Sequence, residues 1–195
     1  KIIADTRPEL DIRININLSN LDNPVYETIK DLPNIHWILS AEASEHRFEY
    51  IRYPLRWTTF INNFKKIQKL PHKISINMSW NILNAFGIFE FIDLMIQNGL
   101  HQNSFVVNPV LEPKYYNVLN LPEDVINTIK NEATKRHGRL HDPFMLKYSY
   151  EAIIKHCNEP LMHKQQELKQ QLETLDSRRS LDSKKVFPEL YERLF

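Results

Sequence analysis

Apolar and polar residues alternate in two segments of the chain, 10–18 (LDIRININL) and 73–78 (KISINM). A period of two is typical of a β-strand that buries one face. Two shorter apolar runs predict two further strands, over 35–40 (IHWILS) and 104–107 (SFVV). The strand at 35–40 leads into the polar segment 47–54 (RFEYIRYP), which we interpret as a loop at the mouth of the fold.

Apolar residues at helical spacing predict a helix after each of the first three strands, over 22–32, 57–70 and 86–98. Asn23 is placed to cap the first of these helices, and Gly99 is placed to end the third. Strands and helices that alternate in this way indicate an α/β fold with a parallel sheet.

After Pro113 the pattern changes to helices alone. One helix is predicted from Leu121 to near Gly138, a second from Asp142 to about His156, and a third from Pro160. Leucines at roughly heptad spacing in the third helix predict that it docks on the sheet: Leu161, Leu168, Leu172 and Leu175.

The composition limits the classes of function. The 195 residues are 42% hydrophobic and 25% charged, which is typical of a globular domain. A net charge of +1 gives no electrostatic case for nucleic acid as a partner. No apolar stretch approaches the roughly 20 residues of a membrane span, and no secretion signal is seen, so we expect a cytoplasmic protein. Three glycines are too few for a glycine-rich phosphate loop.

The loops at the carboxyl ends of parallel strands are where α/β folds bind ligands. Ser40 and Glu42 follow one such strand, and their hydroxyl and carboxylate could hold a ribose or an amino group. The alternative is a turn that these side chains cap. The planar fork of Arg52 suits a carboxylate ligand, and its alternative is an ion pair with Glu45 or Glu49.

Three more polar residues lie at or after other strand ends and are expected to converge with Ser40: Asn17, Ser79 and Asn84. Asparagine is also a common turn residue, so a purely structural role is the alternative for each asparagine. Asn77 lies inside its predicted strand, and we do not include it in the site.

The eight histidines do not form a convincing metal site. His137 and His141 are separated by Gly138, which would break the helix needed to place both on one face. His156 and Cys157 are adjacent and would point in different directions on a helix. We therefore predict no metal ligands in this chain.

Four segments resemble, in order, the second half of radical S-adenosylmethionine (SAM) proteins that carry a twitch-type carboxyl-terminal extension. The segment 40–52 (SAEASEHRFEYIR) is similar to the family's fifth barrel strand, and 79–84 (SWNILN) to its sixth. The helix start at 121–123 (LPE) and the closing 187–191 (FPELY) also match. The resemblance covers most of the chain, and no single segment carries it alone.

The resemblance implies the second half of a partial (β/α)6 barrel over 1–112 and a helical, twitch-like extension over 113–195. It implies that SAM is the cofactor and that an iron–sulfur cluster of the [4Fe–4S] type reduces it, after which a 5′-deoxyadenosyl radical abstracts hydrogen from a substrate. Peptides are common substrates of such relatives. The SAM-binding residues that it implies here are Asn17, Ser40, Glu42, Arg52, Ser79 and Asn84.

The chain also departs from the family. Cys157 is its only cysteine, so the CxxxCxxC loop that binds the cluster is absent and this chain could not be active alone. One explanation is a truncated enzyme whose partner is the missing N-terminal half-barrel, and the resemblance favours this reading. The other is a non-catalytic binding or scaffold protein derived from the same fold. The first explanation predicts an apolar, unpaired edge at the first strand, and the second predicts that a partner covers this edge.

Overall fold

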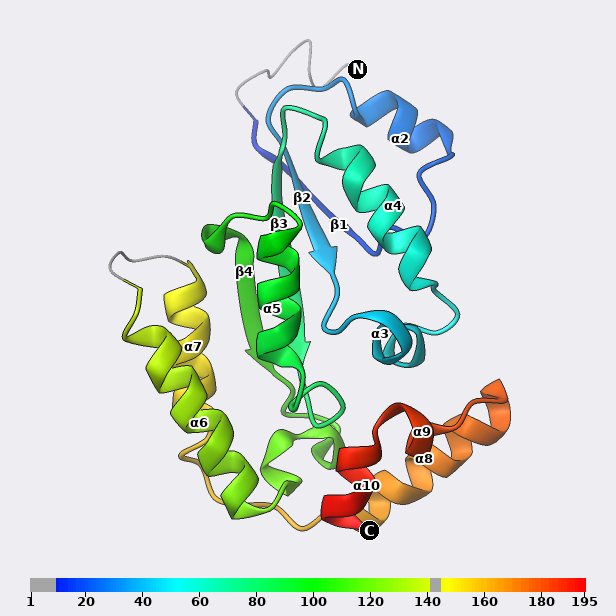
Figure 1. Ribbon diagram of the computed structural model, residues 1–195. Helices are drawn as coiled ribbons and strands as arrows, with labels where there is room; N and C mark the ends of the chain where they lie inside the picture. The colour runs from blue at the N-terminus through cyan, green and yellow to red at the C-terminus, as the bar shows by residue number, and fades with distance from the viewer. Residues whose placement is uncertain (1–9, 141–144) are drawn as a thin grey trace.

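Within residues 10–140 and 145–195, which the computed structural model describes, four parallel strands form one sheet (Figure 1). Their order in the sheet is their order along the chain: β1 (Ile12–Ile16), β2 (Ile35–Ser40), β3 (Lys73–Trp80) and β4 (Phe105–Pro109). Each neighbouring pair is parallel. The predicted α/β class and the four predicted strands are confirmed.

Helices connect the successive strands: α2 (Pro24–Ile29) precedes β2, α3 (Glu45–Ile51) and α4 (Trp57–Ile67) precede β3, and α5 (Ile88–Gln97) precedes β4. The predicted cap of α2 is confirmed, because the Asn23 side chain accepts a hydrogen bond from Tyr26 N at 2.9 Å. Gly99 follows α5 with a φ of 90°, a conformation that favours glycine, as the sequence predicted.

The sheet has one helix-covered face and one open face. Along β2, the buried residues Ile35, Trp37 and Leu39 alternate with partly exposed residues. Buried Phe60 and Phe64 of α4 belong to the same hydrophobic core. Figure 1 shows α4 and α5 on the same side of the sheet. The strand register places the alternate residues on the other side of the sheet, which we call the open face. Its polar residues are Arg13, Asn15, His36, Ser40, Lys73, Ser75, Asn77, Ser79 and Asn108.

The chain after β4 is helical, with short 3-10 turns at η2 (Lys114–Tyr116) and η3 (Val118–Asn120); a further turn, η1 (Gln102–Ser104), precedes β4. The helices are α6 (Glu123–His137), α7 (Met145–His156), α8 (Gln165–Arg179), α9 (Ser183–Val186) and α10 (Pro188–Leu194). Helix α7 packs along β4, where Ser149 Oγ accepts a hydrogen bond from Val107 N at 3.1 Å. Helices α8 to α10 lie beyond the carboxyl ends of the strands (Figure 1).

Two local predictions were wrong at the end of the chain. The last long helix begins at Gln165 rather than at Pro160. The reason is that Met162 N and Lys164 N donate hydrogen bonds to η3, to Leu119 O at 2.8 Å and to Asn120 Oδ1 at 2.7 Å, which holds this segment out of a helix. That helix, α8, packs against η2 and α9 rather than on the sheet.

The predicted mouth loop was also wrong, because residues 47–51 belong to α3. Phe48 and Tyr50 are buried on this helix, and their burial explains why it forms. The predicted start of a helix at Asp142 lies outside the described residues, whereas its predicted end at His156 is confirmed by α7.

Candidate functional site

The carboxyl half of the open face brings together polar side chains from three strands. The register places Ser40 beside Asn77 and Ser79 beside Asn108. Asn108 Nδ2 donates a hydrogen bond to Asn77 Oδ1 at 2.6 Å. Two of the predicted site residues, Ser40 and Ser79, therefore share this face with Asn77 and Asn108, which the sequence analysis did not select.

Glu42 and Arg52, two further predicted site residues, bind each other. The Glu42 side chain is 2% exposed and lies just beyond the end of β2, and Arg52 is the residue that follows α3. Arg52 Nε donates to Glu42 Oε2 at 2.7 Å, and Arg52 Nη2 donates to Glu42 Oε1. Arg52 therefore makes an ion pair, as its alternative interpretation held, but the partner is Glu42 rather than Glu45 or Glu49.

Glu42, at the carboxyl end of β2, also lies near the neighbouring strand β3. The backbone N–H of Ser79, in β3, lies near the Glu42 carboxylate and helps to stabilise its charged form. Burial raises the pKa of Glu42, while Arg52 and the Ser79 N–H oppose this shift by stabilising the charged form. The pair thus joins the ends of β2, β3 and α3, and 27% of the Arg52 side chain stays exposed at this position.

Asn84 and Asn17 take the structural role that was their alternative interpretation. Asn84 is fully buried; its Oδ1 accepts from Asn81 N at 2.8 Å, and its Nδ2 donates to Ser79 O at 3.0 Å. These bonds fix the turn after β3. Asn17 is exposed after β1, and its Oδ1 accepts from Ser19 N at 3.0 Å. Both side chains therefore hold a turn at the end of a strand.

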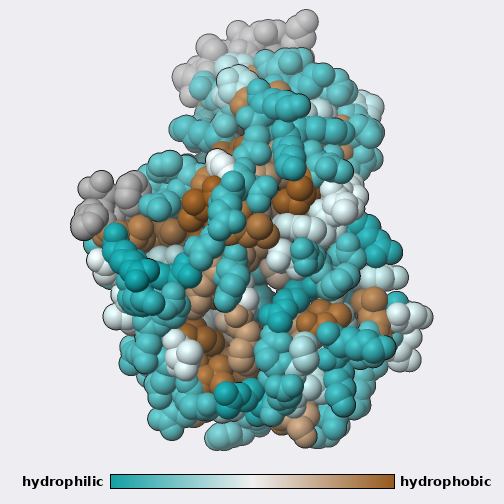
Figure 2. Space-filling model, viewed as in Figure 1, coloured by the Kyte–Doolittle hydropathy of each residue, from teal (hydrophilic) through white to brown (hydrophobic). Residues whose placement is uncertain are grey.

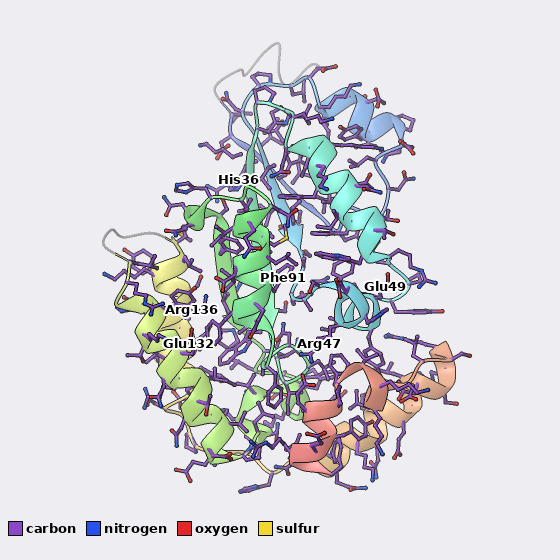
Figure 3. All side chains as sticks on the ribbon, in the orientation of Figure 1. His36, Arg47, Glu49, Phe91, Glu132 and Arg136 are labelled. Atoms are coloured by element: carbon purple, nitrogen blue, oxygen red, sulfur yellow. The ribbon has the colours of Figure 1, made fainter. Side chains whose placement is uncertain are left out.

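A cavity of about 630 Å³ lies over the open face. Its floor combines apolar side chains, such as Ile38 and Val106, with polar ones that include His36, Ser75 and Asn77. No aspartate or glutamate lines it among the described residues. Figure 3 labels His36, which lies at the end of the sheet where the strands begin. The period-two pattern of β3 is the sequence signal that could have identified Asn77 as part of this surface.

Helix α3 contacts the last helices of the chain, α8, α9 and α10 (Figure 3). Arg47 forms an ion pair with Glu189, and its guanidinium lies over the Phe187 ring at 5.9 Å. Tyr50 Oη donates to Asp176 Oδ1 at 2.8 Å, and burial together with this bond raises the pKa of Tyr50. Two of the segments that carry the family resemblance, 40–52 and 187–191, therefore contact each other, although they lie at opposite ends of the chain.

The described residues contain no group of three or more His, Cys, Asp or Glu side chains arranged to hold a metal ion. Cys157 is buried on the carboxyl-terminal side of α7, and burial raises the pKa of its thiol to about 11, which disfavours the thiolate that a metal needs. His137 contacts Glu151, with 2.9 Å between Nε2 and Oε1, and His141 lies outside the described residues.

Fold and site together define an α/β protein whose parallel sheet has helices on one face and a polar cavity on the other. No family model, curated protein or solved structure matches the chain. Among the described helices, none is both long enough and apolar enough to cross a membrane. Figure 2 shows a largely hydrophilic surface on the viewed side, with apolar patches between the helices.

Proposed function

We propose that this chain is the carboxyl-terminal part of a radical SAM enzyme of the twitch type. It would contribute the SAM- and substrate-binding side of an incomplete α/β barrel, and a helical cap. The observation that carries the proposal is a parallel sheet, in sequential strand order, that is covered by helices on one face and presents polar side chains on the other.

The winding of the sheet supports a barrel. Crossover connections between parallel strands are almost always right-handed, so strands in sequential order place their helices on one face. Continued around a closed ring, this arrangement gives a (β/α) barrel, whereas a reversal of strand order gives helices on both faces. The described strands show no such reversal. In this proposal further strands from an upstream half-barrel extend the sheet beyond β1.

The chemistry of the open face supports a ligand rather than a packed barrel interior. Barrel interiors that are filled by side chains are dominated by Val, Ile and Leu. Here Ser40, Asn77, Ser79 and Asn108 occupy the inward positions near the carboxyl ends. Hydroxyl and amide groups can both donate and accept hydrogen bonds, which suits the ribose and amino-acid portions of SAM.

Of the Glu42–Arg52 ion pair, only Arg52 would bind SAM. Both oxygens of Glu42 already accept hydrogen bonds from Arg52, so Glu42 would position Arg52 rather than bind the ligand. The exposed part of Arg52 would then face the methionine carboxylate of SAM. Asn17 and Asn84 would act by fixing the turns of the mouth, as their hydrogen bonds indicate.

The iron–sulfur cluster does not fit the residues of this chain. A [4Fe–4S] cluster needs several cysteine thiolates, and Cys157 is the only cysteine. In this proposal the cluster ligands belong to the upstream half-barrel, and the domain boundary near residue 112 stays a prediction.

A non-catalytic binding or scaffold protein on the same fold is the second candidate. The Glu42–Arg52 pair favours it, because two of the charged groups expected at a SAM site satisfy each other without a ligand. The two candidates differ in whether the full-length protein holds a reducible cluster.

The test is to express the full-length gene product without oxygen, reconstitute it, and measure iron, sulfide and SAM binding. We expect a [4Fe–4S] spectrum that changes on addition of SAM, and at least tenfold weaker SAM binding in Asn77→Leu. Asn62→Leu, on the exposed side of α4, is the matched control and should bind normally. SAM or another ligand bound without any cluster would favour the binding protein, and absence of both would refute the radical SAM proposal.

A further inference from the structure

Three basic side chains form one row across the open face, at the opposite end from the proposed SAM site. Arg13 of β1 lies beside His36 of β2, and His36 lies beside Lys73 of β3. Neighbouring strands are about 5 Å apart, so one small group could contact all three side chains. All three line the 630 Å³ cavity described above.

Among the residues that the structure describes, few negative charges lie near the row. Asp11 is an acidic neighbour in the described part of the chain, with 3.5 Å between its Oδ2 and Arg13 Nε, and both side chains are well exposed, at 47% and 69%. His36 Nε2 lies 2.9 Å from Ser75 Oγ, which orients the imidazole within the cavity. Burial, Arg13 and Lys73 all lower the pKa of His36, and Asp11 opposes them.

The positive charges of this row repel one another unless a negative charge lies close to them. Like charges directly opposite each other on neighbouring strands destabilise a sheet. Protonation of His36 would place three positive charges in register, and an anion between Arg13 and Lys73 would relieve that repulsion while accepting charge-assisted hydrogen bonds. The contact with Asp11 shows that Arg13 already attracts a carboxylate at the edge of this row.

We propose that this cavity binds the anionic end of a small molecule, a carboxylate or a phosphate, through Arg13, His36 and Lys73. The remainder of the ligand lies over Asn15 and Ser75, which offer hydrogen bonds, and over the apolar side chain of Ile38. This anion site lies at the opposite end of the cavity from Asn77 and Asn108, which the SAM proposal uses, and it requires no cluster.

The test uses the full-length protein, purified in air. Inorganic phosphate, pyrophosphate and citrate are titrated separately by calorimetry in chloride buffer, and the His36 ring is followed by NMR, with His36→Gln for assignment. We expect saturable binding of at least one anion and a higher His36 pKa in its presence, because a bound anion favours the imidazolium. Citrate binding without phosphate binding would identify a carboxylate ligand, and the reverse would identify a phosphate ligand.

Substitutions decide whether the row is the site. Arg13→Gln and Lys73→Gln should each weaken binding about tenfold, because each removes a charge-assisted hydrogen bond. Lys65→Gln, an exposed position on α4 on the other side of the sheet, is the matched control and should change nothing. The proposal is overturned if none of the three anions binds saturably, or if binding in both variants equals that of the control. Either result leaves the radical SAM proposal intact, since that proposal depends on SAM and iron measurements.

Discussion

Replacing Arg52 by methionine would leave the Glu42 carboxylate buried without its cationic partner. The methionine keeps most of the aliphatic stem of the arginine, so the main change is the loss of the charge and of two hydrogen bonds. Removing one partner of a buried ion pair costs about 3–5 kcal/mol. Since 27% of the Arg52 side chain is exposed and Ser79 N–H still lies near Glu42, we expect the lower end, about 3 kcal/mol at pH 7.

The loss should depend on pH with a definite sign. The pKa of Glu42 is raised in the folded protein, so its contribution to stability is full below the unfolded pKa and decreases as the pH rises through the folded pKa. Arg52 limits this rise by lowering the pKa of Glu42, and its removal lets the pKa increase further. The difference in unfolding free energy between wild type and Arg52→Met should therefore be smaller at pH 5 than at pH 7.

Urea unfolding followed by tryptophan fluorescence measures this difference, because Trp37 and Trp80 are fully buried. Arg56→Met is the matched control: Arg56 is 73% exposed and pairs with Glu49 at 3.0 Å, so its loss should cost less than about 1 kcal/mol. The double variant Glu42→Gln with Arg52→Met removes both charges and should be more stable than Arg52→Met alone. Equal losses in Arg52→Met and Arg56→Met at both pH values would refute the reasoning.

Three further substitutions test the contacts that shape the site. Asn84→Ala should lower the unfolding free energy by about 2 kcal/mol, because it leaves the buried Asn81 N–H without its acceptor and removes one of the two side-chain bonds to Ser79 O; a loss in urea unfolding no larger than that of Asn62→Ala would contradict this. Tyr50→Phe should cost about 1 kcal/mol and speed hydrogen exchange in α8, since it removes the bond to Asp176; unchanged exchange there would show that this bond does not hold α8 in place. Ser149→Ala should destabilise by about 1–2 kcal/mol in thermal unfolding, because Val107 N loses its acceptor, whereas Ser177→Ala, at an exposed position of α8, should have little effect.

The strands could be predicted because each one buries a single face. Alternation in 10–18 and 73–78 identified β1 and β3, and the turn residues Asn23 and Gly99 marked helix ends that the structure confirms. Local chemistry was sufficient for these features. Helix α3 was missed because it has only seven residues, too few for a periodic pattern to distinguish it from a polar loop.

The pairing of Glu42 with Arg52 could not be predicted, because it depends on how α3 turns the chain back over the end of β2. Glu45 and Glu49 are nearer to Arg52 in sequence, and sequence distance gave no reason to prefer Glu42. The same limit applies to Arg47 and Glu189, which meet only after the last helices fold onto α3. Long-range charge pairs require the packed structure.

The residues of the open face could have been predicted from the sequence. The prediction missed several of them because it considered only residues at the ends of strands. In β3 (KISINMSW), alternate positions separate Lys73, Ser75, Asn77 and Ser79 from the core residues, so one parity contains both proposed binding regions. What the alternation alone cannot say is whether such a polar face meets water or a ligand. Antiparallel sheets commonly leave one face to water, whereas parallel sheets are almost always covered on both. Because this sheet is parallel, its polar face is expected to be covered by another group rather than left to water.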